Sequence, residues 1–333
     1  MASDTGSKAV FFRDRVKTEN LYDEVELSAS DCIAPGKKIR GWFETMVREA
    51  YAVQRLTERA YFVGVSFYNA VFYVGDRGVL LIDPLSGPAT QNLIAAVREV
   101  TALPIDTLVY THYHLDHVEG AAQVAGAVAE TGGSLNIVGT DLTRSRIEKF
   151  GGKIPLPDVV VTGHDGEFAF EGITVRLRTP EDGGHCPDNA MVFLKDDGVV
   201  QFDDMVEPGM MPFPKFGTQE DIIACEENLV ELAGHDWRFV NGGHGNIGGK
   251  DDVRFYLDYF RDLREATGAV MERVKLADFV VPTHSHMGQW MNFLHAVSAL
   301  AKEELRGKYG RYYGFEEAVP SHVEMMVDAI VSY

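Results

Sequence analysis

Three histidines and one aspartate lie within six positions of the sequence and have the spacing of metal ligands: His112, His114, Asp116 and His117. In an extended segment the side chains of His112 and His114 point the same way. Asp116 and His117 fall on the following turn into a helix and can face a second point in space. Imidazole and carboxylate together suit zinc, with iron, manganese or cobalt as alternatives. The run therefore predicts two adjacent metal ions, and three histidines at this spacing disfavour a cluster of surface or capping side chains.

This run resembles the signature of the metallo-β-lactamase superfamily, which is His-x-His-x-Asp-His. Four further motifs of that family occur in the expected order. They are an aspartate that ends an early strand, a histidine after a glycine, an aspartate after a strand, and a histidine between two glycines: Asp83, His185, Asp204 and His244. Asp203 stands where a glycine is usual. The resemblance covers about residues 60–262.

The resemblance implies a dinuclear centre that binds two divalent ions, with zinc expected first and iron or manganese as alternatives. One ion would be held by His112, His114 and His185. The other would be held by Asp116, His117 and His244. Asp204 would bridge both ions, with Asp203 as the alternative because of the departure at that position. Asp116 and Asp204 are the expected catalytic residues, and Asp83 would order the ligand-bearing loops, as supporting carboxylates do at metal sites.

Two adjacent divalent ions lower the pKa of a bound water from about 15.7 toward about 7, so hydroxide forms at neutral pH. The resemblance thus implies a metallohydrolase. The candidate bonds are those of an ester, a lactone, a thioester, a sulfate ester or an activated aryl ether. A mononuclear-iron oxygenase of the same fold, similar to persulfide dioxygenases, is the alternative. A non-catalytic scaffold is disfavoured because all seven proposed ligands are present.

The segment that follows Asp204 is apolar and rich in methionine, phenylalanine and proline. Flexible thioether and aromatic side chains suit a pocket for an apolar or aromatic small molecule. The candidate pocket residues are Met210, Met211, Phe213 and Phe216. The alternative is a loop that packs on the C-terminal helices.

Strand and helix patterns alternate from residue 61 onward and predict an α/β fold with two mixed sheets. Strands are expected at residues 61–74, 79–82, 107–111, 135–139, 159–161, 173–177, 190–194, 199–202 and 239–240. Helices are expected at residues 91–100, 121–131 and 221–233. With the resemblance, this pattern predicts a four-layer αββα sandwich of the metallo-β-lactamase type, flanked by an N-terminal extension and C-terminal helices.

Three regions are expected along the chain. Residues 1–58 form an N-terminal extension with one helix within residues 41–56, residues 59–250 the catalytic domain, and residues 251–333 a helical segment on the core or at an oligomer interface. Helices are predicted near residues 253–264, 288–305 and 321–331. His284 and His286 repeat the His-x-His spacing without a nearby acidic ligand, so they are interpreted as a helix N-terminal or interface pair. His322 is interpreted as a surface or core residue.

Composition limits the partners. The 333 residues carry a net charge of −19, and such a surface repels phosphate backbones and anionic membranes. A small-molecule substrate is expected, with no nucleic acid and no membrane partner, in a homo- or hetero-oligomer. The three cysteines are widely spaced, the first residues are polar, and no run of 18 apolar residues occurs. These features predict a cytoplasmic protein without disulfides.

Overall fold

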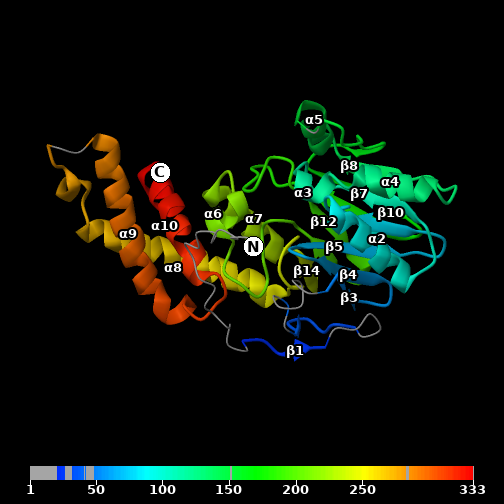
Figure 1. Ribbon diagram of the computed structural model, residues 1–333, viewed down its shortest axis with the longest axis horizontal. Coiled ribbons are helices and arrows are strands. Elements are labelled where there is room, and N and C mark those ends of the chain that lie inside the picture. The colour runs from blue at the N-terminus through cyan, green and yellow to red at the C-terminus, as the bar shows by residue number, and fades with distance from the viewer. Residues whose placement is uncertain are drawn as a thin grey trace, which may run out of the picture.

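The computed structural model describes residues 21–26, 32–40, 42, 49–150, 152–282 and 285–332. Two sheets lie face to face, and helices cover the outer face of each sheet (Figure 1). This is the four-layer αββα arrangement predicted from the sequence, with additional helices at the C-terminal end.

The first sheet has seven strands in the order β3-β4-β5-β6-β7-β8-β9. Their bounds are Ala52–Arg55, Ala60–Val65, Tyr68–Val74, Val79–Ile82, Ile105–Val109, Asn136–Thr140 and Val159–Val161. The first four strands pair antiparallel and the rest pair parallel. Helices α2 (Pro88–Val100) and α4 (Ala121–Ala129) lie in the crossovers between parallel strands, and α5 (Asp141–Phe150) follows β8.

The second sheet has five strands in the order β10-β11-β12-β13-β14. Their bounds are Asp165–Phe170, Ile173–Arg178, Met191–Leu194, Val199–Gln201 and Phe239–Asn241, with the 3-10 turn η1 (Lys195–Asp197) before β13. Only β13 and β14 pair parallel among these strands. Their crossover contains α6 (Pro214–Thr218) and α7 (Ile222–Gly234). The carboxyl ends of β13 and β14 therefore lie at one edge of the sheet.

Apolar side chains form the layers between these elements. Phe62 and Leu80 of the first sheet and Val192 of the second belong to one buried cluster, which fills the space between the sheets. Leu93 of α2 lies in a second cluster on the outer face of the first sheet. A third cluster joins the second sheet to α7 and to the C-terminal helices, and it includes Leu229.

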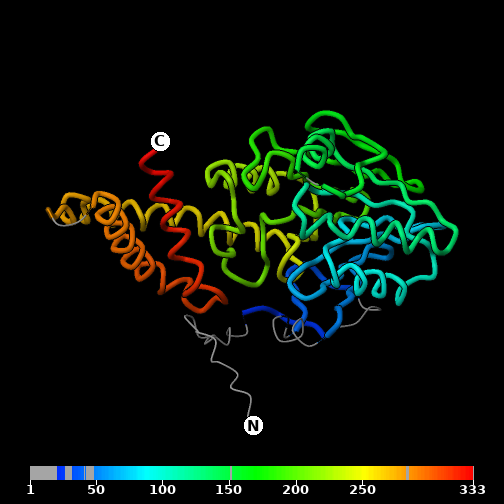
Figure 2. The backbone as a smooth tube through the Cα atoms, turned by 45° about the horizontal axis from the view of Figure 1, so that its top comes forward, coloured from blue at the N-terminus to red at the C-terminus, as the bar shows by residue number. Residues whose placement is uncertain are grey.

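The C-terminal helices are α8 (Lys250–Arg273), η2 (Leu276–Phe279), α9 (His286–Tyr309) and α10 (Phe315–Ser332). They extend away from the sandwich (Figure 2), yet α10 packs against α6 and shares its apolar cluster. The helices in the described part of the chain include none long and apolar enough to cross a membrane. The C-terminal segment is thus continuous with the core beside the second sheet.

The N-terminal region differs from the prediction. Residues 52–55 form β3 of the first sheet, so the expected helix does not continue there. Trp42 is helical and buried, whereas residues 43–48 lie outside the described range. A short parallel pair, β1 (Glu24–Val25) and β2 (Lys38–Ile39), precedes it. Strand β4 is buried, so its backbone groups need hydrogen-bond partners on both sides, and residues 52–55 pair with it on one side in place of the expected helix. Helix α5 and strand β10 were not predicted from the sequence.

Candidate metal centre

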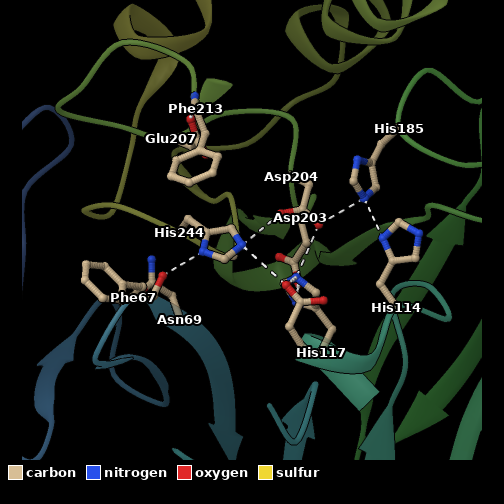
Figure 3. Close-up of polar contacts among 12 residues, drawn as sticks. Phe67, Asn69, His114, His117, His185, Asp203, Asp204, Glu207, Phe213 and His244 are labelled. Carbon is tan, nitrogen blue, oxygen red and sulfur yellow. Dashed lines mark hydrogen bonds and ion pairs between the residues drawn. The ribbon is translucent and has the colours of Figure 1, made fainter. Parts of the chain in front are cut away.

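The sequence-predicted ligands come from separate loops that meet at one edge of the sandwich, and their polar atoms face one another (Figure 3). Each follows a strand or begins a helix. His112 and His114 follow β7, and Asp116 and His117 lie on the one-turn helix α3 (Leu115–Val118). The others follow β11, β13 and β14 and are His185, Asp204 and His244.

His112, His114 and His185 form the first half of the site. The His114 Nδ1 and His185 Nε2 atoms are 2.8 Å apart, and the His112 ring centroid lies 4.7 Å from that of His114 and 5.1 Å from that of His185. Cys186 also brings its sulfur within reach of these nitrogens. Its thiol donates to Asp188 at 3.3 Å, and burial raises the pKa of Cys186 well above its usual value. Since metal binding requires the thiolate, Cys186 is a poor ligand here.

Asp116, His117 and His244 form the second half. Asp116 Oδ2 lies 3.4 Å from His117 Nε2 and 3.9 Å from His244 Nε2. His244 is held from its other side, because its Nδ1 contacts the carbonyl oxygen of Phe67 at 2.6 Å. That contact orients Nε2 toward the carboxylates, as the second nitrogen of a ligating imidazole commonly does.

Asp204 lies between the two halves. Its Oδ2 is 3.3 Å from His112 Nε2, 3.1 Å from His185 Nε2 and 3.2 Å from His117 Nε2. Its Oδ1 is 2.9 Å from His244 Nε2. One buried carboxylate thus faces imidazoles from both halves, which is the position that a bridging ligand requires.

Asp203 and Asp83 lie behind the site. Asp203 Oδ2 contacts His117 Nδ1 at 2.9 Å and accepts a hydrogen bond from Gln201 at 3.0 Å. Asp83 accepts hydrogen bonds from the backbone and hydroxyl of Thr111, at 3.0 and 2.6 Å. Burial and the nearby Asp203 carboxylate raise the pKa of Asp83 well above its usual value. These contacts join the loop that carries His112 to the loop after β13.

The loop backbones are shaped to bring these groups together. Asp204 has a φ of 63°, in the left-handed region that aspartate tolerates better than most residues. Gly243, beside His244, has a φ of 77°, and a Cβ there would lie 2.9 Å from the His117 ring. Only glycine fits at that position without displacing the imidazole.

The donor set fits a divalent cation. His112 and His117 are fully buried, and among the residues that the structure describes their Nε2 atoms form no hydrogen bond, although Asp204 Oδ2 lies 3.3 and 3.2 Å from them. Buried polar atoms without hydrogen bonds cost free energy, and converging imidazoles and carboxylates are ligands of zinc. Burial and the adjacent imidazoles lower the pKa of His114 to about 3, so His114 stays in the neutral form that binds metal.

The imidazoles of the second half, His117 and His244, bind protons more tightly than His114 does. Burial opposes a charge on His117, but the Asp204 and Asp203 carboxylates raise the pKa of His117 well above its usual value. Burial likewise opposes a charge on His244, yet Asp204 raises its pKa to about 9. A cation bound by these two imidazoles would displace their protons, so its affinity depends on pH.

The four candidate pocket residues separate into two groups. Met211 and Phe216 are buried in the third apolar cluster, where the Phe216 ring stacks on Phe260 with centroids 4.6 Å apart. They pack under the C-terminal helices, which was the alternative for this segment, whereas Met210 is half-buried. Phe213 is 55% exposed. Its backbone N–H donates to the Glu207 carboxylate, whose pKa is raised by burial and lowered by the nearby charge of His244.

Three residues near the site were not predicted to have a role there. Phe67 is 67% exposed at the tip of the β4–β5 hairpin and holds His244 through its carbonyl. Glu207 is buried, and burial raises its pKa to about 7. His322 of α10 reaches the Phe213 carbonyl at 2.9 Å. None of the three had a visible signal: one strand was predicted over residues 61–74, whereas the structure has β4 and β5 with the turn that carries Phe67 between them.

Cys186 and His286 lie in different surroundings. Cys186 is buried beside His185. His286 is exposed at the first residue of α9, and Ser285 caps that helix. His284 lies outside the described residues.

Comparisons with known proteins give relatives and structural neighbours. The family model of the metallo-β-lactamase superfamily matches residues 63–284. The "2,4-dinitroanisole O-demethylase subunit beta" of Nocardioides sp. (strain JS1661) is 24% identical over 270 residues, which are 79% of this chain and 76% of that protein. The "Beta-lactamase-like protein 2 homolog" of Drosophila melanogaster is 29% identical over 156 residues, 43% of this chain and 46% of that protein.

Two solved metallo-β-lactamases superpose on the chain. The enzyme from Pontibacter korlensis has a TM-score of 0.53 at 20% identity, covering 63% of this chain and 99% of its own. The enzyme from Erythrobacter litoralis has a TM-score of 0.51 at 19% identity, covering 64% and 97%. At these identities the two structures show a shared fold and nothing further about the reaction.

Proposed function

The chain belongs to the metallo-β-lactamase superfamily, and we propose that it is a metal-dependent hydrolase whose substrate is a small activated aryl ether. The observation that carries the hydrolase proposal is the position of Asp204, whose two oxygens face the His112–His114–His185 half and the Asp116–His117–His244 half. Those seven residues would hold two divalent ions, zinc in the first instance. Such ions supply a Lewis acid and lower the pKa of water.

The two carboxylates would have different tasks. The Asp204 side chain is 8% exposed and contacts four imidazoles, so it would hold the halves of the site together. The Asp116 side chain is 39% exposed. Burial works against the charge of Asp116, but His117 and His244 hold its pKa well below the usual range. Asp116 therefore stays ionised and would orient the attacking water by accepting a hydrogen bond from it.

The substrate class rests on the demethylase subunit, which resembles this chain over most of both lengths. Its name specifies an aryl methyl ether as substrate. Phe213 and Phe67 offer exposed apolar surface near the Glu207 and His244 side of the site. In the proposed reaction, the oxygen of water bonds to the aryl carbon, the bond from that carbon to the alkoxy oxygen breaks, and the alkoxide leaves with a proton as the alcohol. The products are a phenol and an alcohol, without any oxidant.

Assembly and location form a second part of the proposal. The relative is named as a subunit, which supports a homo- or hetero-oligomer. The C-terminal segment, residues 251–333, packs on the core, and we propose that it also makes contacts between subunits. Residues 59–250 are the proposed catalytic domain. The cytoplasm and a small-molecule substrate, with no nucleic acid or membrane partner, remain predictions.

The test combines metal analysis with turnover of 2,4-dinitroanisole, measured as release of 2,4-dinitrophenolate. We expect about two divalent ions per chain, loss of activity on chelation, recovery with zinc, and equal rates with and without oxygen. Asp204→Asn is the matched inactive control. One iron per chain with turnover that depends on oxygen would favour the oxygenase alternative.

A panel of other bonds separates the class of enzyme from its substrate. Phenyl acetate, a γ-lactone, an acyl thioester and an aryl sulfate would be assayed with the same protein. Metal-dependent hydrolysis of one of these with no release from dinitroanisole would retain the metallohydrolase and reject the aryl ether.

A further inference from the structure

The loop that carries Phe213 has an unusual backbone. Lys215, Phe216, Gly217 and Thr218 all have positive φ, at 57°, 52°, 70° and 65°. Three of these four residues have a Cβ, for which the left-handed region is unfavourable. Such a run persists only where the surroundings hold it in place. The contacts that hold this turn therefore control where the exposed Phe213 side chain lies.

The turn is held from the C-terminal helices. His322 Nε2 of α10 donates to the carbonyl of Phe213 at 2.9 Å. The Ser321 hydroxyl accepts from the backbone N–H of Lys215 at 2.8 Å, and the carbonyl of Tyr313 accepts from Met211 N–H at 2.9 Å. On the opposite side of the same residue, the N–H of Phe213 donates to Glu207. Both backbone polar groups of Phe213 are thus fixed by buried side chains.

His322 is itself fixed by a second buried group. Its Nδ1 lies 2.9 Å from the hydroxyl of Tyr259 in α8. Because a carbonyl oxygen can only accept, Nε2 must carry the proton and Nδ1 must accept from Tyr259. The His322 ring also packs on Phe216, with centroids 4.1 Å apart. A chain of hydrogen bonds therefore runs from Tyr259 through His322 to the backbone of Phe213.

We propose that His322 is a positioning residue for substrate binding, which fixes the Phe213 side chain at the edge of the metal centre. This inference rests on the proposed function, because it assigns Phe213 to the substrate. It gives α8 and α10 a part in recognition although neither supplies a proposed ligand. The expected effect of losing His322 is a raised KM, with kcat and metal content nearly unchanged, since Phe213 binds no metal.

The first test measures the loop without using activity. Hydrogen–deuterium exchange of residues 211–219 would be followed by mass spectrometry in chelated and in zinc-loaded protein. His322→Leu removes both hydrogen bonds, whereas His322→Gln keeps an N–H that can reach the Phe213 carbonyl. Val323→Ala, at a buried neighbour in α10, controls for general loosening of the helix. We expect at least tenfold faster exchange in His322→Leu only. Wild-type exchange in that variant would overturn the proposal.

The second test asks whether His322 acts through Phe213. With 2,4-dinitroanisole, or with whichever ester or lactone the protein hydrolyses, His322→Leu should raise KM about tenfold and change kcat less than twofold. In a Phe213→Ala background the same substitution should change KM little, because coupled residues are not additive. Equal effects in both backgrounds would overturn the proposal. If wild type hydrolyses none of the probes, the proposed function fails, and the exchange experiment still decides whether His322 fixes the loop.

Discussion

The Oδ2 atom of Asp203 lies 2.9 Å from Nδ1 of His117, on the side of the imidazole that faces the protein interior. The next residue, Asp204, faces Nε2 of the same ring at 3.2 Å. Two consecutive carboxylates thus address opposite nitrogens of one imidazole. The left-handed backbone of Asp204 allows this, because it turns the chain between the two side chains. Asp203 orients the ring, and Asp204 lies where the proposed metal ions would be.

Asp204→Asn and Asp203→Asn should therefore differ. Asparagine tolerates positive φ at position 204, so that substitution changes the charge with little backbone strain. We expect Asp204→Asn to lose at least one metal equivalent and more than a hundredfold in activity. Asp203→Asn should keep both ions at saturating metal, with affinity about tenfold to a hundredfold weaker. Metal titration with mass spectrometry separates the two, and a larger metal loss in Asp203→Asn would reverse the assignment.

Substitution of His112 or His114 by alanine should remove metal and abolish hydrolysis while the fold remains. Both residues lie in a loop after β7 and outside the apolar clusters, so little packing is lost. Exposed His286→Ala is the matched control, for which metal content and activity should be unchanged. Metal content by mass spectrometry and secondary structure by circular dichroism test this. Full metal content in either site variant would reject the ligand assignment.

Phe213→Ala should change substrate turnover and Phe216→Ala should change the stability of the fold. Phe213 is exposed, so its truncation should lower kcat/KM roughly tenfold to a hundredfold for an aromatic substrate and leave Tm nearly unchanged. Phe216 is buried on Phe260, and its truncation should destabilise the fold by about 3–5 kcal/mol. Steady-state kinetics and thermal melting measure both. A Phe213→Ala variant that melts early but keeps wild-type kcat/KM would place Phe213 in the packing.

We expect the fold to lose stability at low pH because His322 is buried in its neutral form. Burial lowers the pKa of His322 to about 4, from its usual value of 6.5. Between these pH values the unfolded chain binds a proton at His322 that the folded chain does not bind. The stability that neutral His322 contributes to the fold is therefore fully present above pH 6.5 and is lost as the pH falls toward 4. The change in pKa from 6.5 to about 4 corresponds to about 3 kcal/mol of unfolding free energy. Urea unfolding of chelated wild type and His322→Gln measures this. The free energy of unfolding should fall less at acid pH in the variant than in wild type. Identical pH dependence would contradict it.

The sequence was sufficient for most strands and helices of the sandwich, although not for β3, α5 or β10, and for a set of side chains able to bind metal. A buried strand such as Val79–Ile82 appears as a continuous apolar run, and the residue after it must emerge at the edge of the sheet. The spacing of His112 and His114 and the glycines around His244 are local properties. Local properties can be read from a single sequence because they depend on neighbours in the chain.

Other features of the site depend on contacts between residues far apart in the chain. One φ angle and the contacts of Asp203 with His117 and Gln201 decide that Asp204, and not Asp203, lies between the two halves of the site. Helices α8 and α10 decide which side chains of residues 210–216 are available to line a pocket. They cover Phe216 and leave Phe213 exposed. The same helices bring His322 to the Phe213 carbonyl across more than a hundred positions. Composition cannot indicate such pairs, because each side chain is ordinary until the fold places its partner within hydrogen-bond distance.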